Sequence, residues 1–145
     1  MATDRTADWA QVLARVSASP MYRLFNLGVE EIGEGYARLR MPVGERYHQL
    51  YAVVHGGIAA TLADSCIGVA MLTLVTAAEM AVTVEMKINY LAPLVQGELI
   101  GEGRIVHHGR TLSLGEADLR DQDGRLIAKA TATYMVLPPA EQAAE

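Results

Sequence analysis

The segment from His55 to about Ala77 constrains the fold of this chain more than any other part of the sequence. It opens with two glycines, and apolar residues lie nearly all round a helix drawn through it, which is typical of a buried helix. Small residues recur along it at Ala59, Ala60, Thr61, Ala63, Ser65, Gly68 and Ala70. Because small side chains let other backbone come close, we expect a long central helix with a sheet wrapped around it.

Strand patterns lie on both sides of this helix. They cover residues 28–41, with a turn at 33–35, and then 82–91, 98–107, 111–120 and 125–137. The later segments are joined by short turns, Gly109-Arg110 and residues 121–124, which are typical of hairpins. Strands that follow one another with short connections form an antiparallel sheet. The chain is therefore predicted to be an α+β domain with one apolar helix inserted after the first strands.

The length of 145 residues suits one domain, and we expect residues 1–145 to form it. A short amphipathic helix is predicted over about residues 8–18, because apolar residues recur there at three- and four-residue spacing. The low-complexity tail, about residues 138–145, is expected to be disordered.

Composition excludes several classes of function. The net charge is −5 and the basic residues are scattered, which argues against a nucleic-acid partner. The single cysteine, Cys66, permits neither an intramolecular disulfide nor a cysteine metal cluster, and no metal site is expected. No apolar stretch reaches the length of a membrane helix, and the N-terminus lacks the apolar run of a secretion signal. The sequence therefore predicts a cytoplasmic protein with no membrane partner.

The two glycines at the helix start are a first candidate for chemistry. A helix N-terminus presents unpaired N–H groups and a partial positive charge, and at Gly56 no Cβ blocks the approach of a ligand oxygen. These properties suit a carbonyl oxygen that becomes negative during acyl transfer. The alternative is that Gly56-Gly57 only permits the turn into the helix.

Asp64 is the second candidate, since a carboxylate is costly to bury among apolar residues. It could act as a cap, pair with a buried arginine, or be a nucleophile or general base. Asp64 follows Gly56 by eight residues, which is about 12 Å along one helix, too far for both to reach one carbonyl. If they act together, a second copy must bring its Asp64 to the first copy's Gly56. Two antiparallel helices related by a two-fold axis would achieve this.

Three polar residues near the helix have both chemical and structural interpretations. Gln49 could donate its amide to an acyl carbonyl or orient a water molecule, or it could be a solvent-facing loop residue. His55 could act through its imidazole, but a hydrogen bond to backbone near the helix start is favoured, because a glycine amide already supplies the electrophilic contact. Thr83 could hold an attacking water. The alternative is that it is an ordinary strand residue, because β-branched residues are common in strands.

These residues resemble a known family. The run QLYAVVHGG, residues 49–57, and the triplet ADS, residues 63–65, strongly resemble hotdog-fold thioesterases of the phenylacetyl-CoA and hydroxybenzoyl-CoA type. That family has Asn or Gln six residues before His-Gly-Gly, and Asp or Glu eight residues after the first glycine. The segments 83–93 (TVEMKINYLAP) and 109–111 (GRT) are also similar, so the resemblance runs from about residue 24 to 137.

The resemblance implies the hotdog fold, in which a curved antiparallel sheet wraps a long central helix, in homodimers and often homotetramers. It implies hydrolysis of an acyl-CoA or aryl-CoA thioester, with coenzyme A as part of the substrate and no cofactor. By position in the motif, Gly56 would supply the oxyanion amide and Gln49 would help to polarise the carbonyl. Asp64, from the partner subunit, would be nucleophile or general base, with Thr83 positioning water. Ala52 stands where the family commonly has glycine, which predicts a somewhat different loop shape.

Coenzyme A carries phosphates, so an acidic protein needs local positive charge to bind it. A turn that combines glycine with a basic residue can present N–H groups and a guanidinium to phosphate, although solvated hairpin charges are the alternative. The candidates for binding the substrate and coenzyme A are Gly57, Lys87, Arg104, His107, His108, Gly109, Arg110 and Lys129. Residues that either line an acyl pocket or belong to the core are Leu62, Cys66, Ile67 and Met71. The alternative functions are an acyl-CoA hydratase or dehydratase of the same fold and a non-catalytic acyl-CoA-binding protein.

Overall fold

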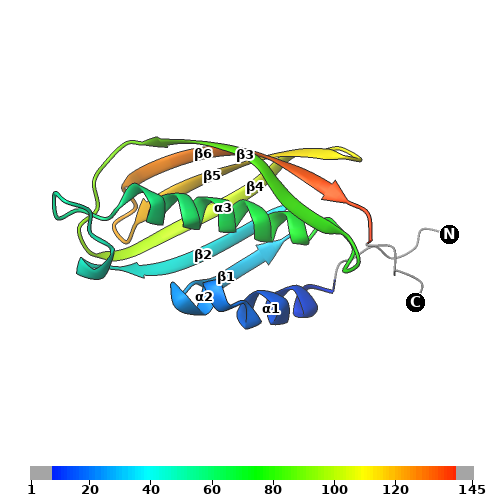
Figure 1. Cartoon of the computed structure of the whole chain (residues 1–145), viewed down its shortest axis with the longest axis horizontal. Coiled ribbons are helices and arrows are strands. Elements are labelled where there is room, and N and C mark those ends of the chain that lie inside the picture. Colours follow the sequence, from blue (N-terminus) through cyan, green and yellow to red (C-terminus); the bar gives the residue numbers. More distant parts are fainter. Residues whose placement is uncertain (1–7, 140–145) are drawn as a thin grey trace.

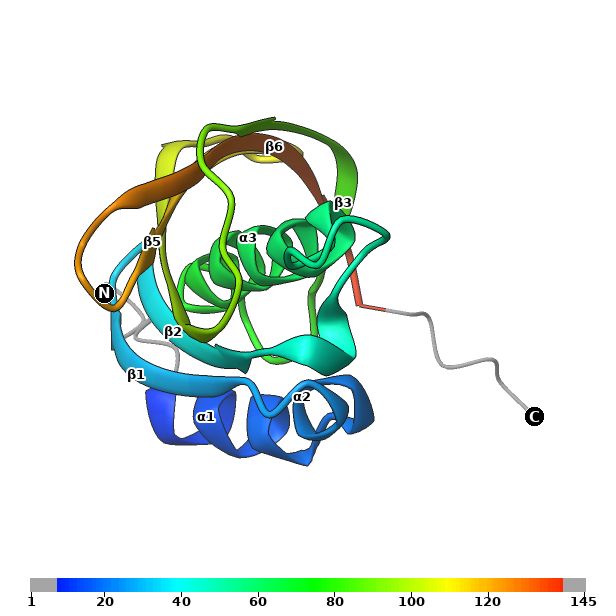
Figure 2. The same ribbon diagram turned by 90° about the vertical axis from the view of Figure 1, so that its left-hand side faces the viewer.

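A curved antiparallel sheet wraps around one long helix, and two shorter helices lie against the open side (Figure 1, Figure 2). The computed structural model describes residues 8–139. In chain order the elements are α1 (Trp9–Ala18), α2 (Pro20–Leu24), β1 (Gly28–Gly33), β2 (Tyr36–Val43), the 3-10 turn η1 (Glu45–Tyr47), α3 (Gly56–Leu72), β3 (Met80–Tyr90), β4 (Gly97–His108), β5 (Leu112–Asp121) and β6 (Leu126–Leu137). The predicted α+β arrangement, a long helix inside a curved antiparallel sheet, is confirmed.

The first helix, α1, is the amphipathic one predicted over residues 8–18. Asp8 caps its start by accepting a hydrogen bond from the Ala10 N–H at 3.1 Å, and its buried residues are Val12 and Val16. The short helix α2, which begins with a proline, is absent from the sequence prediction; it packs Tyr22 against the core. Of the tail expected to be disordered, residues 140–145 lie outside the described part of the chain.

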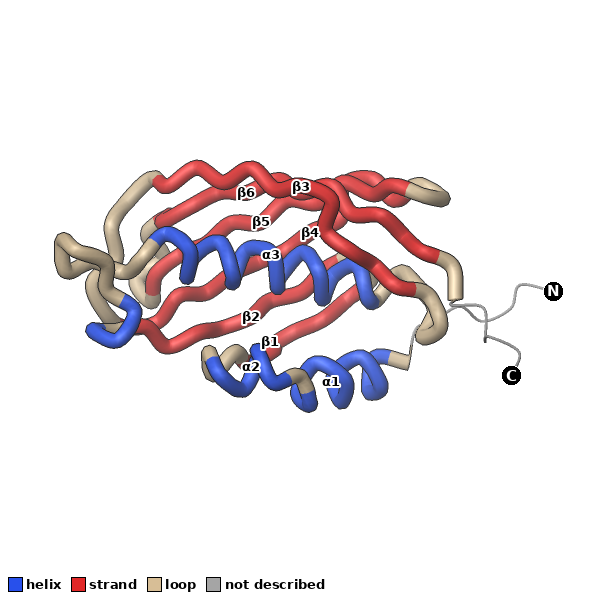
Figure 3. The backbone as a smooth tube through the Cα atoms, viewed as in Figure 1, coloured by secondary structure: helices blue, strands red, loops and turns tan. Residues whose placement is uncertain are grey.

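The six strands follow the order β1-β2-β4-β5-β6-β3, and each neighbouring pair is antiparallel (Figure 3). Each strand begins and ends within two residues of the predicted segments. Strand β3 does not lie between β2 and β4, where it falls in the sequence. After α3, the chain returns at the far edge of the sheet beside β6, where Thr83 lies opposite Tyr134. The chain order of the strands therefore differs from their spatial order.

The central helix α3 is buried, as its sequence predicts. Four side chains that could have lined a pocket or formed core are all 0% exposed and belong to the core cluster; they are Leu62, Cys66, Ile67 and Met71. Within the described residues, no helix is both long and apolar enough to cross a membrane.

The helix ends at Leu72, so the predicted extension to Ala77 is wrong. The reason lies in a contact with another element. The Thr73 hydroxyl donates to the Ala70 carbonyl at 2.7 Å and accepts from the Gly35 N–H at 2.8 Å. This contact ties the end of α3 to the turn between β1 and β2, and the apolar residues that follow pack as a loop.

Glycines of the sheet let it approach α3 closely. A Cβ on Gly103 of β4 would overlap the main-chain carbonyl of Cys66 and lie 2.7 Å from the Ile67 nitrogen. The helix backbone therefore lies directly against this strand. This close packing depends both on the small side chains of the helix and on the glycines of β4.

We expect Gly103→Ala to lower the free energy of unfolding by about 1–3 kcal/mol, because a Cβ there forces helix and strand apart. Urea unfolding followed by circular dichroism measures the change. Gly28→Ala is the matched control, since a Cβ at that strand position meets nothing within 4 Å, and its effect should stay below about 0.5 kcal/mol. Equal destabilisation by the two substitutions would contradict this account of the packing.

Candidate active site

The start of α3 leaves one backbone donor free. His55 is the N-cap: its Nδ1 accepts a hydrogen bond from the Gly57 N–H at 2.8 Å, and its carbonyl accepts from the Ile58 N–H at 2.9 Å. Among residues 8–139, no hydrogen bond uses the Gly56 N–H. This N–H points out of a helix N-terminus, where the helix dipole favours negative charge. The geometry of His55 agrees with the structural interpretation of this histidine.

Tyr90 explains why the first residue of α3 is a glycine. Its hydroxyl donates to the Gly56 carbonyl at 3.0 Å, and a Cβ on Gly56 would lie 3.0–3.2 Å from three atoms of the tyrosine. The close approach of this ring leaves little room for a side chain. Beside it lies a hollow of about 410 Å³ between the first turn of α3 and the sheet. The hollow is lined mainly by apolar groups, among them Val54, Ala59, Leu91, Leu94, Leu99 and Ile127.

Gln49 lies on the loop that leads into α3. Its main-chain N–H donates to the Val53 carbonyl at 2.8 Å, and its side-chain Oε1 accepts from the Tyr51 N–H. The amide nitrogen of the side chain makes no hydrogen bond within the described chain, so it can donate to a ligand. Ala52, in the same loop, has a φ of 57°, the left-handed region that favours glycine. The loop therefore holds a glycine-like backbone at the position where the family commonly has glycine.

Asp64 is held by two hydroxyl groups. Thr83 Oγ1 donates to its Oδ1 at 2.7 Å, and the Tyr134 hydroxyl lies 2.5 Å from the same oxygen. Neither a cap nor a buried arginine explains Asp64, because no ion pair in the described range involves it. Hydroxyl donors satisfy a carboxylate without neutralising it, so Asp64 keeps a charge that is available for chemistry. Because the one hydroxyl proton of Thr83 is engaged in the hydrogen bond to Asp64, Thr83 can only accept a hydrogen bond from a water molecule.

The candidate residues fall into two groups. The oxyanion half comprises Gln49, His55 and Gly56, and the carboxylate half comprises Asp64 and Thr83 together with Tyr134. Because Gly56 and Asp64 are eight residues apart on one helix, the halves are separated by about 12 Å. One chain does not bring them to a common carbonyl group.

The basic candidates are spread over the molecule. His108, Gly109 and Arg110 lie at the β4–β5 hairpin, at the end of the molecule where α3 finishes and away from Gly56 (Figure 1). The His108 ring bonds to Ser113 Oγ at 2.8 Å, and Arg110 is exposed. Lys87 lies between two residues of β3 that pack on the core, so it points away from α3. Within one chain, none of them is grouped with the oxyanion half.

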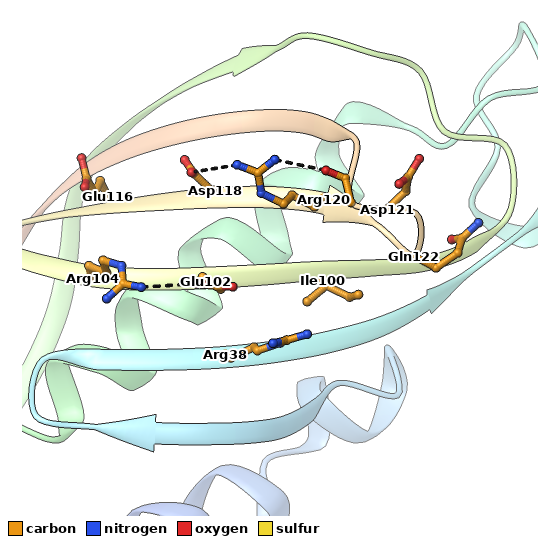
Figure 4. Close-up of a pocket in the computed structure, with 10 residues that line it drawn as sticks. Arg38, Ile100, Glu102, Arg104, Glu116, Asp118, Arg120, Asp121 and Gln122 are labelled. Carbon is orange, nitrogen blue, oxygen red and sulfur yellow. Dashed lines mark hydrogen bonds and ion pairs between the residues drawn. The ribbon is translucent and has the colours of Figure 1, made fainter.

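A trough of about 300 Å³ lies on the outer face of the sheet (Figure 4). Its arginines are matched by carboxylates: Arg104 pairs with Glu102 at 3.4 Å, and Arg120 pairs with Asp118 at 3.6 Å. Lys129, on the same face, also pairs with Asp118. Because these charges compensate one another, Arg104 and Lys129 are poor candidates for binding the phosphates of coenzyme A.

Cys66 is the only thiol, and it is fully buried. Burial raises the pKa of this thiol, so it stays protonated and is not a nucleophile. No group of three or more His, Cys, Asp or Glu residues in the described chain is arranged to hold a metal ion.

Two tyrosines of the site, Tyr90 and Tyr134, are missing from the residues that the sequence singles out. Neither has a local signal that distinguishes it from an ordinary strand residue. Tyr134 could be found only through the register of β3 against β6, which sets it opposite Thr83.

Known proteins resemble this chain in sequence and in fold. The sequence profile of the thioesterase superfamily matches residues 51–128. A thioesterase family protein from Silicibacter pomeroyi is 30% identical, with a TM-score of 0.82 over 90% of this chain and 98% of that one. The 1,4-dihydroxy-2-naphthoyl-CoA hydrolase of Escherichia coli is 24% identical over 127 residues, 88% of this chain and 93% of the enzyme. The PaaI protein from the phenylacetic acid degradation operon of E. coli shares the fold, with a TM-score of 0.84 over 90% of this chain and 94% of that one, at 18% identity. The chain therefore belongs to the thioesterase superfamily and is a thioester hydrolase with the hotdog fold.

Proposed function

We propose that this protein hydrolyses an acyl-CoA or aryl-CoA thioester to the free acid and coenzyme A. The observation that carries the proposal is the carboxylate of Asp64, which is held by two hydroxyls and has no cationic partner in the described chain. The free N–H of Gly56 supports it, since a helix N-terminus stabilises an oxyanion. The relative that acts on a dihydroxynaphthoyl-CoA supports a coenzyme A ester as the substrate.

In the proposed reaction, the thioester carbonyl oxygen accepts hydrogen bonds from the Gly56 N–H and from the Gln49 side-chain amide. Asp64 acts in one of two ways. As a nucleophile it forms an acyl anhydride and expels the thiolate, and water then hydrolyses the anhydride. As a general base it takes a proton from water, which attacks the carbonyl and expels the thiolate. The coenzyme A thiolate is a good leaving group, so neither route needs a strong acid.

We propose that each site is shared by two chains, so the functional unit is a homodimer. The oxyanion half of one chain would meet the carboxylate half of the other across a two-fold axis. The edge strand β3 supports this arrangement, because within the described residues it is unpaired on one side and its exposed residues include Met80, Val84 and Tyr90. An association of two such dimers into a homotetramer is the further expectation from the family resemblance.

The proposed dimer also gives the basic hairpin a role. In each chain, His108, Gly109 and Arg110 lie at the end where α3 finishes. Two antiparallel helices would bring this end of one chain towards Gly56 of its partner. The guanidinium of Arg110 would then bind a phosphate of coenzyme A, whereas the Gly109 N–H already donates to the Leu112 carbonyl at 2.9 Å. Lys87 points to the other face of the sheet, so it would contact only a nucleotide that lies outside the sheet.

We expect the native protein to release thiol from members of a panel of acyl-CoA and aryl-CoA esters. Asp64→Asn should lower kcat by about 10²–10⁴-fold, because it removes the nucleophile or base while keeping the shape of the side chain. A thiol-trapping dye measures the release. Asp123→Asn, on the exposed β5–β6 turn, is the control and should keep native activity. A native protein that hydrolyses no ester of the panel would disprove the proposal and leave the binding-protein alternative.

Mixing two inactive variants tests the shared site. Asp64→Asn disables the carboxylate half, and Gly56→Ala disables the oxyanion half by placing a Cβ against Tyr90. When equal amounts are unfolded and refolded together, half of the dimers contain both chains and one intact site, which restores about a quarter of the native activity. Each variant refolded alone is the control. No recovery in the mixture would show that each site is built from one chain.

His55 is expected to act as a cap rather than as an acid or base. His55→Ala should lower the free energy of unfolding by about 0.5–2 kcal/mol, because the Gly57 N–H loses its acceptor. His55→Asn can accept the same hydrogen bond, so it should recover both stability and thiol release. Thermal unfolding and the thiol assay measure the two effects. A stable but inactive His55→Asn would instead make the imidazole part of the chemistry.

A further inference from the structure

The hydroxyl of Tyr134 makes two contacts with Asp64. Its single proton faces two acceptors, the main-chain carbonyl at 2.8 Å and the side-chain Oδ1 at 2.5 Å, and Oδ1 is the nearer of the two. The tyrosine is 3% exposed. It reaches α3 beside Gly68, one turn after Asp64, where a Cβ would lie only 3.3 Å from the hydroxyl. The ring is therefore packed between β6 and α3 with its one polar atom at the carboxylate.

Thr83 reaches the same oxygen from the neighbouring strand. Thr83 and Tyr134 are partners in the β3–β6 register, so their side chains stand next to each other on one face of the sheet. Both hydroxyls meet at Oδ1 of Asp64. Oδ2 accepts no hydrogen bond from residues 8–139, so it is the oxygen that remains available to a reaction partner.

We propose that Tyr134 is a positioning residue for thioester hydrolysis: together with Thr83 it holds Oδ1 of Asp64 and so presents Oδ2 to the thioester carbonyl or to water. The inference rests on the proposed function, in which Asp64 is the nucleophile or base. An aspartate side chain free to rotate would have to be ordered in each reaction. Tyr134 orders it before substrate binds, because it contacts both the main chain and the side chain of this residue.

Tyr134 remains a donor at neutral pH. Burial, and next the hydrogen bond to Asp64, raise the pKa of Tyr134, while the hydrogen bond with Thr83 lowers it. The negative charge of Asp64 and the neighbouring Tyr22 of α2 raise it further. Burial also raises the pKa of Tyr22, so both phenols stay protonated. Tyr134 can therefore orient the carboxylate but cannot take a proton from it.

Tyr134→Phe tests the proposal, because it keeps the ring and removes only the hydroxyl. We expect kcat to fall on the order of 10–100-fold, the value of one hydrogen bond to a charged group, with KM changed less than about twofold. A carboxylate that loses a donor is easier to protonate, so the acidic limb of the pH–rate profile should move to higher pH. A purely structural tyrosine would lower stability and activity without moving this limb, and that result would overturn the proposal.

Two further substitutions sharpen the test. Tyr36→Phe is the matched control, since this tyrosine lies beneath Arg104 on the outer face, and its loss of a hydroxyl should leave activity native. Thr83→Val removes the second donor to Oδ1. The double variant with Tyr134→Phe should lose more activity than the product of the two single losses, because either hydroxyl alone still holds the carboxylate in part. If the loss of activity in the double variant equals the product of the two single losses, the two hydroxyls do not act together on Asp64.

A measurement without substrate separates this inference from the proposed function. The carbon NMR signal of the Asp64 carboxyl group, identified by its loss in Asp64→Asn, reports protonation directly. Its titration midpoint should lie at higher pH in Tyr134→Phe than in the native protein. Equal midpoints would overturn the role of Tyr134 even if thioesters are hydrolysed. If the midpoint shifts but the native protein releases no thiol from any ester, the proposed function is overturned. The contact of Tyr134 with Asp64 would then have no role in thioester hydrolysis.

Discussion

The close approach of α3 to the sheet is the constraint on which the rest of the structure depends. At Gly103, the strand lies directly against the helix backbone of Cys66 and Ile67. A helix so deep in the curve of the sheet is surrounded by apolar groups, and its polar atoms must find partners there. Asp64 meets this requirement with hydroxyls of β3 and β6, which reach it only because the helix lies so close to them.

The choice of hydroxyl partners has a chemical consequence. An arginine beside Asp64 would also satisfy the hydrogen bonds of the carboxylate. Its positive charge, however, would compensate the negative charge of Asp64. Thr83 and Tyr134 provide hydrogen bonds without a formal charge, and both act on the same oxygen. The carboxylate is thereby held at Oδ1, while its Oδ2 accepts no hydrogen bond from the described residues. The outer face of the sheet shows the opposite case, since Arg104, Arg120 and Lys129 are paired with carboxylates and have no evident chemistry.

Each half of the proposed site is held in place by contacts within its own chain, but neither half contains all the groups that the proposed reaction needs. In the oxyanion half, His55 accepts the hydrogen bond of the Gly57 N–H, and the Gly56 N–H has no acceptor among residues 8–139. In the carboxylate half, two hydroxyls hold Oδ1 of Asp64, and Oδ2 has no donor in the described part of the chain. The rigid helix between them fixes their separation, so bending or a side-chain rotation cannot join them in one chain. The proposed dimer resolves this, because a two-fold axis supplies each half with the complement that its own chain lacks.

Much of this protein was determined by the sequence alone, because local patterns carry the relevant physics. Alternating residues located the strands, small apolar residues located α3, and helix geometry made the distance between Gly56 and Asp64 predictable. Only the tertiary structure decided where α3 ends, since Thr73 is tied to the distant Gly35. It also decided that β3 lies beside β6, which brings Tyr134 next to Thr83. These features depend on contacts between segments far apart in the chain, and no local pattern of residues specifies which distant strand will become a neighbour.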